Sequence, residues 1–223
     1  MIFRKRSPRQ HGARWHYNHG IVLYRAGQYR KALHAFARAI RLGNDMPGAH
    51  AGHGLSLAAL GRPAKAIRHL EKAMALQEER QGGADPATAP WFPEAATACG
   101  QTYEELSQWY MALRCYTKAL RLLARPEVEL HRSRARVHLQ LDQGEQALED
   151  LNQALELEPD DAATYYYRAQ AHERLGHRKR QAEDLQRFLA LADADDPHRL
   201  AAVEALRALQ PEAPTDGETA ARR

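Results

Sequence analysis

A period of about 34 residues recurs along this chain and restricts the possible folds more than any other feature. It is carried most clearly by small residues, in the pairs Gly20 and Gly54, Ala32 and Ala66, and Ala39 and Ala73. A fixed period of this length is typical of a supersecondary unit that stacks on copies of itself, because one unit cannot bury its own apolar face. We therefore expect a repeat protein that offers a binding surface rather than a catalytic site.

Each period contains two segments with apolar residues at helical spacing, which predicts two helices per unit. Pro63 stands where the second helix of the second unit should begin, and a helix tolerates proline there because the first-turn N–H has no helical partner. Five units fit the chain, at residues 13–46, 47–80, 93–126, 128–161 and 162–195. The segment 196–210 predicts one further helix that caps the last unit.

Three segments fall outside the period. Residues 1–12 form a basic N-terminal arm, and residues 211–223 form an acidic, proline-containing tail that we expect to be disordered. Residues 81–92 are rich in glycine and proline and predict a loop inserted between the second and third units. Trp91 and Phe92 end this insertion. We expect them to be buried between these two units, and the alternative is an exposed aromatic contact for a partner.

The pattern resembles the tetratricopeptide repeat, and the first unit carries the fullest match, with Gly20, Tyr24-Arg25-Ala26-Gly27-Gln28-Tyr29, Ala32, Phe36 and Ala39. The unit departs from that pattern at His19, where leucine is usual. Asn44 also stands where the fourth unit has Pro159. The resemblance covers residues 13–195. It implies an all-α, right-handed α-solenoid of helix–turn–helix units with a concave groove.

In this family, five positions of each first helix usually line the groove, which binds a peptide or a helix of a partner protein. The resemblance assigns to the groove Arg14, Tyr17, Ile21, Tyr24, Arg25, Ala51, Leu55, Gln101, Glu104, Glu105, Arg132, Arg136, Tyr166, Gln170 and Arg174. These residues change from apolar and aromatic through acidic to basic, which suits an extended peptide with an apolar anchor and charged flanks. The alternative, for any one position, is a solvated helix face.

Co-chaperones of this family hold a terminal carboxylate with lysine and asparagine on the first helices. This chain has Tyr17, Ile21 and Gly52 at those positions, so it lacks that clamp.

Charge is distributed unevenly along the chain. Residues 1–76 contain 14 Lys and Arg but only two acidic residues, whereas residues 77–223 contain 18 Lys and Arg and 26 acidic residues. The second helices of the first two units carry Arg30, Lys31, Arg38, Arg41, Lys65, Arg68 and Lys72. This basic half offers an alternative function, which is association with nucleic acid or an anionic membrane. The simpler interpretation is a solvated outer face.

No arrangement of residues predicts catalysis or a cofactor, since the chain has no phosphate-binding loop and no nucleophile elbow. His16, His19, His50 and His53 repeat a spacing of three residues, but we interpret them as packing residues rather than metal ligands. Cys99 and Cys115 are expected to be small buried residues and not a disulfide.

We find no signal peptide and no apolar run long enough to span a membrane. The sequence therefore predicts a cytoplasmic, non-catalytic adaptor, and its Arg-, Ala- and Leu-rich composition suggests a bacterial source.

Overall fold

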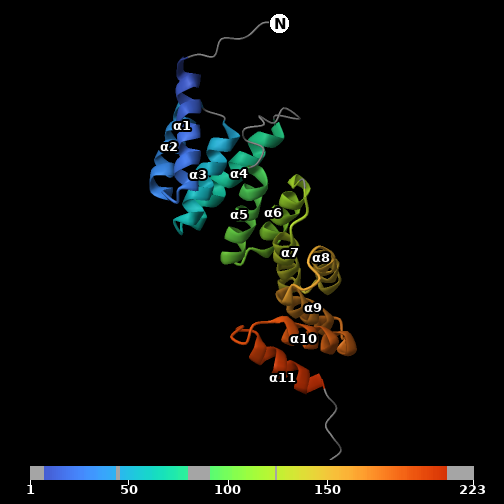
Figure 1. The fold of residues 1–223 in the computed structure, drawn as a ribbon. Helices are drawn as coiled ribbons and strands as arrows, with labels where there is room; N and C mark the ends of the chain where they lie inside the picture. Colours follow the sequence, from blue (N-terminus) through green and yellow to red (C-terminus); the bar gives the residue numbers. More distant parts are fainter. Residues whose placement is uncertain (1–7, 44–45, 80–90, 124, 210–223) are drawn as a thin grey trace, which may run out of the picture. The chain divides into compact units, whose positions relative to one another are not determined.

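The computed structural model describes residues 8–43, 46–79, 91–123 and 125–209. These residues form α-helices joined by short turns, and no β-strand occurs in the described ranges (Figure 1). The predicted all-α architecture of helix–turn–helix units is confirmed.

The chain divides into two compact units. Unit one, Met1–Pro126, contains α1 (Pro8–Arg25), α2 (Tyr29–Leu42), α3 (Pro47–Ala59), α4 (Pro63–Glu79), α5 (Trp91–Glu105) and α6 (Trp109–Leu122). Unit two, Glu127–Arg223, contains α7 (Val128–Gln140), α8 (Gly144–Leu157), α9 (Ala162–Arg174), α10 (Arg178–Leu191) and α11 (Arg199–Leu209). Each repeat is a pair of adjacent helices, and α4 begins at Pro63 as the sequence predicts.

The two helices of every repeat are joined by the same turn. A residue with positive φ follows two places after the end of each first helix, and the five residues are Gly27, Gly61, Ser107, Asp142 and Gly176. The next amide then bonds back to the carbonyl five residues earlier, as Gln28 does to Leu23 at 2.9 Å. This hydrogen bond belongs to a common helix C-cap that reverses the chain. Glycine adopts positive φ without steric cost, whereas Ser107 and Asp142 pay a small conformational penalty.

Within each repeat, the first helix presents a small residue to a large one that follows 16 positions later on the second helix. Phe36 is fully buried, and a Cβ atom added to Gly20 would lie 2.7 Å from its ring. The same spacing places Gly54 against Leu70 and Gly100 against Tyr116, with Cβ distances of 2.7 and 2.5 Å. These distances are too short for any side chain, so the glycines allow the helices to approach closely.

Unit two uses alanine in place of glycine for the same contact. Ala135 and Leu151 share one buried cluster, and Ala169 and Leu185 share another. The second cluster continues through Phe188 to Ala202 of α11. The helix α11 therefore covers the apolar side of α10, at the place where the sequence predicts a capping helix.

Two helices begin elsewhere than the sequence predicts. The first helix starts at Pro8, five residues before the first predicted unit, and proline suits a helix start because it lacks an N–H. The helix α5 starts at Trp91, so Trp91 and Phe92 are not part of a loop. Residues 1–7, 81–90 and 211–223 of the predicted arm, insertion and tail lie outside the described residues.

Trp91 and Phe92 are both buried, in agreement with the packing interpretation. The ring of Trp91 packs against Tyr24 at 5.4 Å and Phe36 at 6.4 Å between centroids. These partners belong to the first repeat, so Trp91 reaches beyond the second and third repeats, between which the sequence predicts it to be buried. The Trp91 side chain thereby connects α5 to the aromatic core of α1 and α2.

We expect Gly52→Ala to lower the free energy of unfolding by about 1–3 kcal/mol, measured by chemical denaturation. A Cβ atom there would lie 2.4 Å from the Phe36 ring, which is fully buried and has no room to move. Gly12→Ala is the matched control, because its Cβ would meet only Leu42 at 3.5 Å. This control should gain up to about 1 kcal/mol from helix propensity. Equal stability of both variants would contradict the packing described above.

Candidate protein-interaction surface

The first helices of successive repeats contact one another within each unit. In unit one α1 contacts α3 and α3 contacts α5, and in unit two α7 contacts α9. The predicted groove residues on these helices are called here the first-helix surface of each unit.

Three predicted groove residues in unit one are buried. The exposed fractions of Tyr17, Ala51 and Leu55 are 2%, 0% and 3%. The Tyr17 ring packs against Phe36 with a centroid distance of 6.1 Å. These side chains therefore belong to the interior of unit one, and a partner does not reach them in this structure.

The remaining predicted residues of unit one are accessible. Arg14, Arg25, Gln101 and Glu105 are exposed, whereas Ile21, Tyr24 and Glu104 are partly buried. Two of the partly buried residues are held by hydrogen bonds.

The Tyr24 hydroxyl donates to Glu94 Oε1 at 3.3 Å, which joins the end of α1 to the start of α5. Burial and the neighbouring Glu94 raise the pKa of the Tyr24 phenol, and burial also raises the pKa of Glu94. Glu104 accepts a hydrogen bond from the Tyr116 hydroxyl. The first-helix surface of unit one therefore combines exposed basic residues on α1 with acidic residues on α5.

The first-helix surface of unit two is dominated by arginine. Arg132 donates to Asp161 Oδ2 at 2.6 Å and also pairs with Glu129. Asp161 in turn caps α9, since its carboxylate accepts from the Thr164 amide at 3.0 Å. The two carboxylates thus hold the Arg132 guanidinium between α7 and α9.

The other predicted residues of unit two lie on the same two helices. Arg136 and Gln170 are partly buried, and exposed Arg174 approaches Asp142 at 3.8 Å. Tyr166 is half-covered, because its ring stacks on His198 at 4.4 Å between centroids. The structure therefore brings basic side chains, an amide and an aromatic ring onto adjacent helices of unit two.

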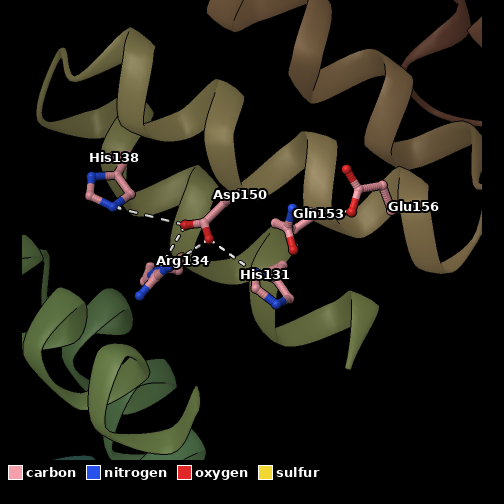
Figure 2. A network of polar contacts seen from close by, with 6 residues as sticks. All are labelled: His131, Arg134, His138, Asp150, Gln153 and Glu156. Atoms are coloured by element: carbon pink, nitrogen blue, oxygen red, sulfur yellow. Dashed lines mark hydrogen bonds and ion pairs between the residues drawn. The ribbon is translucent and has the colours of Figure 1, made fainter. Parts of the chain in front are cut away.

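A buried polar network in unit two was not predicted. Figure 2 shows Asp150 of α8 between Arg134 and His131 of α7, with His138 nearby. Arg134 donates two hydrogen bonds to the Asp150 carboxylate, at 2.8 and 2.7 Å, and His131 Nδ1 lies 3.0 Å from Oδ1. Burial raises the pKa of Asp150, but the hydrogen bonds from His131 and Arg134 outweigh it and leave this pKa below its ordinary value.

The next repeat contains the same arrangement one period later. Arg168 donates to both oxygens of Asp184 at 2.8 and 2.7 Å, and His172 Nε2 lies 3.7 Å from Asp184. The sequence carries a signal for this network, because Arg134, His138 and Asp150 are each followed by the same residue type 34 positions later. A search for recurring polar residues, rather than apolar ones, would have found it.

In both repeats the aspartate follows the arginine by 16 positions. The arginine directly precedes the small residue of the apolar contact between the two helices, and the aspartate directly precedes the large one. We call these sites the paired positions. In unit one they hold His53 and His69, whose ring centroids lie 4.1 Å apart, and Cys99 and Cys115, whose sulfurs lie 3.0 Å apart. Each of these four repeats therefore places two interacting polar side chains at its paired positions.

His16, His19, His50 and His53 of unit one do not come together in one cluster. His50 and His53 contact His69, whereas His16 and His19 pack on Trp15. In the described ranges, no group of three or more His, Cys, Asp or Glu side chains has the geometry to hold a metal ion. Burial, with His69 and His50 nearby, lowers the pKa of His53 to about 4. Its Nδ1 atom is buried without a hydrogen-bond partner.

Comparisons with known proteins agree with this repeat architecture. Residues 17–84 match a family model described as a tetratricopeptide repeat, and residues 135–176 match one described as a TPR repeat. The chain is a tetratricopeptide-repeat protein. The two matches place these repeats in both compact units.

The curated relatives of this tetratricopeptide-repeat protein are much longer. Protein unc-45 homolog B of Xenopus tropicalis is 31% identical over 94 residues, which cover 41% of this chain and 10% of that protein. The mitochondrial import receptor subunit TOM70 of Homo sapiens is 29% identical over 124 residues, which cover 47% of this chain and 20% of that protein. The matched part of this chain therefore spans no more than a fifth of either relative.

Solved structures share the fold over most of the chain. The crystal structure of YrrB, described as a TPR protein with an unusual peptide-binding site, has a TM-score of 0.71 and 18% identity, and covers 86% of this chain and 90% of YrrB. A MamA crystal structure has a TM-score of 0.66 and 17% identity, with coverages of 80% and 91%. At these identities the likeness concerns the fold alone.

In the part of the chain that the structure describes, no helix combines the length and the apolar character that a membrane span needs.

We expect Asp150→Asn to lower the free energy of unfolding by about 2–3 kcal/mol at pH 7, because it leaves Arg134 with a weakened, neutral partner. The folded-state pKa of Asp150 lies below the unfolded value of about 3.9. Its stabilisation is therefore present above that pH and is lost as the pH falls through the folded pKa.

Denaturant unfolding between pH 7 and pH 2 measures both effects. The variant should lose less stability on acidification than the wild type does. Asp142→Asn is the control, since its carboxylate is 89% exposed and its change should stay within about 0.5 kcal/mol. A destabilisation of Asp150→Asn no larger than this control would show that the network contributes little.

Proposed function

We propose that this tetratricopeptide-repeat protein is a non-catalytic adaptor that binds an extended, acidic segment of a partner protein on the first-helix surface of unit two. One observation carries the proposal, which is that Arg132, Arg136 and Arg174 lie on the contacting first helices α7 and α9, with Arg132 held in place by two carboxylates. Because the arginine is held before any partner arrives, binding sacrifices less side-chain freedom.

The residues around Arg132 fit the same type of partner. Arg136 and Arg174 add positive charge, Gln170 offers an amide, and Tyr166 offers the edge of a ring that is fixed on His198. Guanidinium groups bind carboxylates through paired hydrogen bonds, so acidic side chains of the partner match this surface. The peptide-binding site named for YrrB supports the proposal by analogy of fold.

Unit one extends the proposal to partners of mixed charge. Its exposed residues are basic on α1, at Arg14 and Arg25, and acidic or polar on α5, at Gln101 and Glu105. The apolar residues Tyr17, Ala51 and Leu55 of the first-helix surface are buried, so polar and charged contacts dominate on this surface. We place the adaptor in the cytoplasm, where free thiols such as Cys99 and Cys115 persist.

The experiment starts from affinity capture with mass spectrometry, followed by mapping of the bound segment on a peptide array. Binding of the mapped peptide is then measured by fluorescence anisotropy. We expect Arg136→Glu/Arg174→Glu to weaken binding at least about tenfold, which corresponds to about 1.4 kcal/mol. Circular dichroism verifies that the variant remains folded.

Arg178→Glu/Arg180→Glu is the matched control, because these exposed arginines lie on α10, the second helix of the repeat that contains Arg174. It changes the net charge equally and should leave the affinity unchanged. Equal weakening by both double variants would indicate nonspecific charge attraction, and no weakening by either would exclude this surface.

A second candidate function is binding of a polyanion by the second helices of unit one. All seven basic residues predicted there are exposed, at Arg30, Lys31, Arg38 and Arg41 on α2 and at Lys65, Arg68 and Lys72 on α4. Such binding releases counterions and weakens steeply with salt.

Anisotropy with labelled RNA and sedimentation with anionic vesicles, each at 50 and 200 mM salt, test this candidate. Lys65→Glu/Arg68→Glu/Lys72→Glu should reduce affinity at least about tenfold for whichever polyanion binds. The absence of binding to both at the lower salt concentration would exclude it.

A further inference from the structure

Cys99 and Cys115 are the only two cysteines of the chain, and the fold brings them together. Cys99 lies on α5 and Cys115 on α6, and their sulfur atoms are 3.0 Å apart. Both side chains are buried and both are free thiols. A disulfide has a sulfur–sulfur distance of about 2.05 Å, so bond formation shortens the present separation by about 1 Å.

The surroundings make the two sulfurs chemically different. Cys115 lines a surface pocket of about 700 Å³, together with Arg114, Lys118 and Arg121 of the same helix and residues of α4. The hydrogen bond between the two thiols lowers the pKa of Cys115, and Arg114 and Lys118 lower it further, against the opposing effects of burial and Glu71. The hydrogen bond to Cys115 and burial raise the pKa of Cys99.

The pocket and its cationic side chains assign the roles. The thiolate is the reactive form of cysteine, and cationic neighbours favour it. Cys115 is therefore the attacking residue, beside a pocket that admits a small oxidant. Cys99 does not line this pocket and therefore reacts in the second step.

We propose that the Cys99–Cys115 pair is an oxidative modification site, at which a hydroperoxide converts the two thiols into an intramolecular disulfide. This function is separate from partner binding and does not depend on it.

The reaction balances in two steps. The Cys115 thiolate attacks one oxygen of hydrogen peroxide, the O–O bond breaks, and with one proton the products are Cys115 sulfenic acid and water. The Cys99 sulfur then attacks the sulfenic sulfur, the S–O bond breaks, and the Cys99 proton leaves with the hydroxide as a second water. The two thiols lose two electrons in total, and the peroxide accepts them.

The disulfide would join the two helices of the third repeat at its paired positions. The fourth and fifth repeats join the same positions by ion pairs, of Arg134 with Asp150 and of Arg168 with Asp184. The third repeat has two thiols there instead of an ion pair. Oxidation would therefore give it a covalent link at the positions where its neighbours have an electrostatic one. A link of this kind restricts the unfolded chain and opposes local opening of α5 and α6.

The test exposes the reduced full-length protein to a small molar excess of hydrogen peroxide. We expect the intact mass to fall by about 2 Da, the two hydrogens lost, and the count of free thiols to fall from two to zero. Reduction should reverse both changes. Hydrogen exchange of α5 and α6 should be slower in the oxidised protein, whereas exchange in α9 and α10 should be unchanged.

Two variants separate the steps. Cys99→Ser should stop at the Cys115 sulfenic acid, which dimedone traps, and Cys115→Ser should give neither the disulfide nor a rapid sulfenic acid. The proposal is overturned if both thiols of the folded wild type survive peroxide that oxidises the denatured chain. It is equally overturned if the product is a dimer linked between chains, as seen on a non-reducing gel, or if Cys115→Ser traps dimedone as fast as Cys99→Ser does.

Discussion

The contact between a small residue on the first helix and a large residue 16 positions later on the second is the constraint on which the rest of this structure depends. Glycine or alanine lets the two helices approach closely. The fully buried Phe36 and Tyr116 rings show that each contact removes a large side chain from water. Burial of one large apolar side chain contributes about 1.5–3 kcal/mol. The common turn with positive φ then returns the chain at the same register in every repeat.

The paired positions lie one residue earlier than this contact and show what the fold leaves variable. Their spacing follows from the apolar contact next to them, and in the second to fifth repeats two interacting side chains meet there. The fourth and fifth repeats place an arginine and an aspartate there, the third places two thiols and the second places two imidazoles. One geometry thus supports an ion pair, a redox-reactive pair and a histidine pair in neighbouring repeats.

Much of the fold could be predicted from the sequence, because small residues at a fixed period and prolines at helix starts are local signals. The helix start at Trp91 could not, since the preceding glycine- and proline-rich residues suggested a loop that included it. Trp91 is held by Tyr24 and Phe36, which belong to the first repeat and are distant from it in the chain.

Family positions predicted the surface only in part. They identified Arg132 and Arg174 on adjacent helices, but they also included Tyr17 and Leu55, which are buried and not on the surface. The Asp150 network was missed because the prediction followed apolar periodicity, although the polar residues recur at the same period.

Native-state hydrogen exchange tests the central claim most directly, because it reports the stability of each repeat separately. If the contacts between small and large residues hold the two helices of each repeat together, the slowest amides in the second helices should be those of Phe36, Leu70, Tyr116, Leu151 and Leu185. The claim would be contradicted if these amides exchanged as fast as those of exposed helical residues such as Val22 and Leu200.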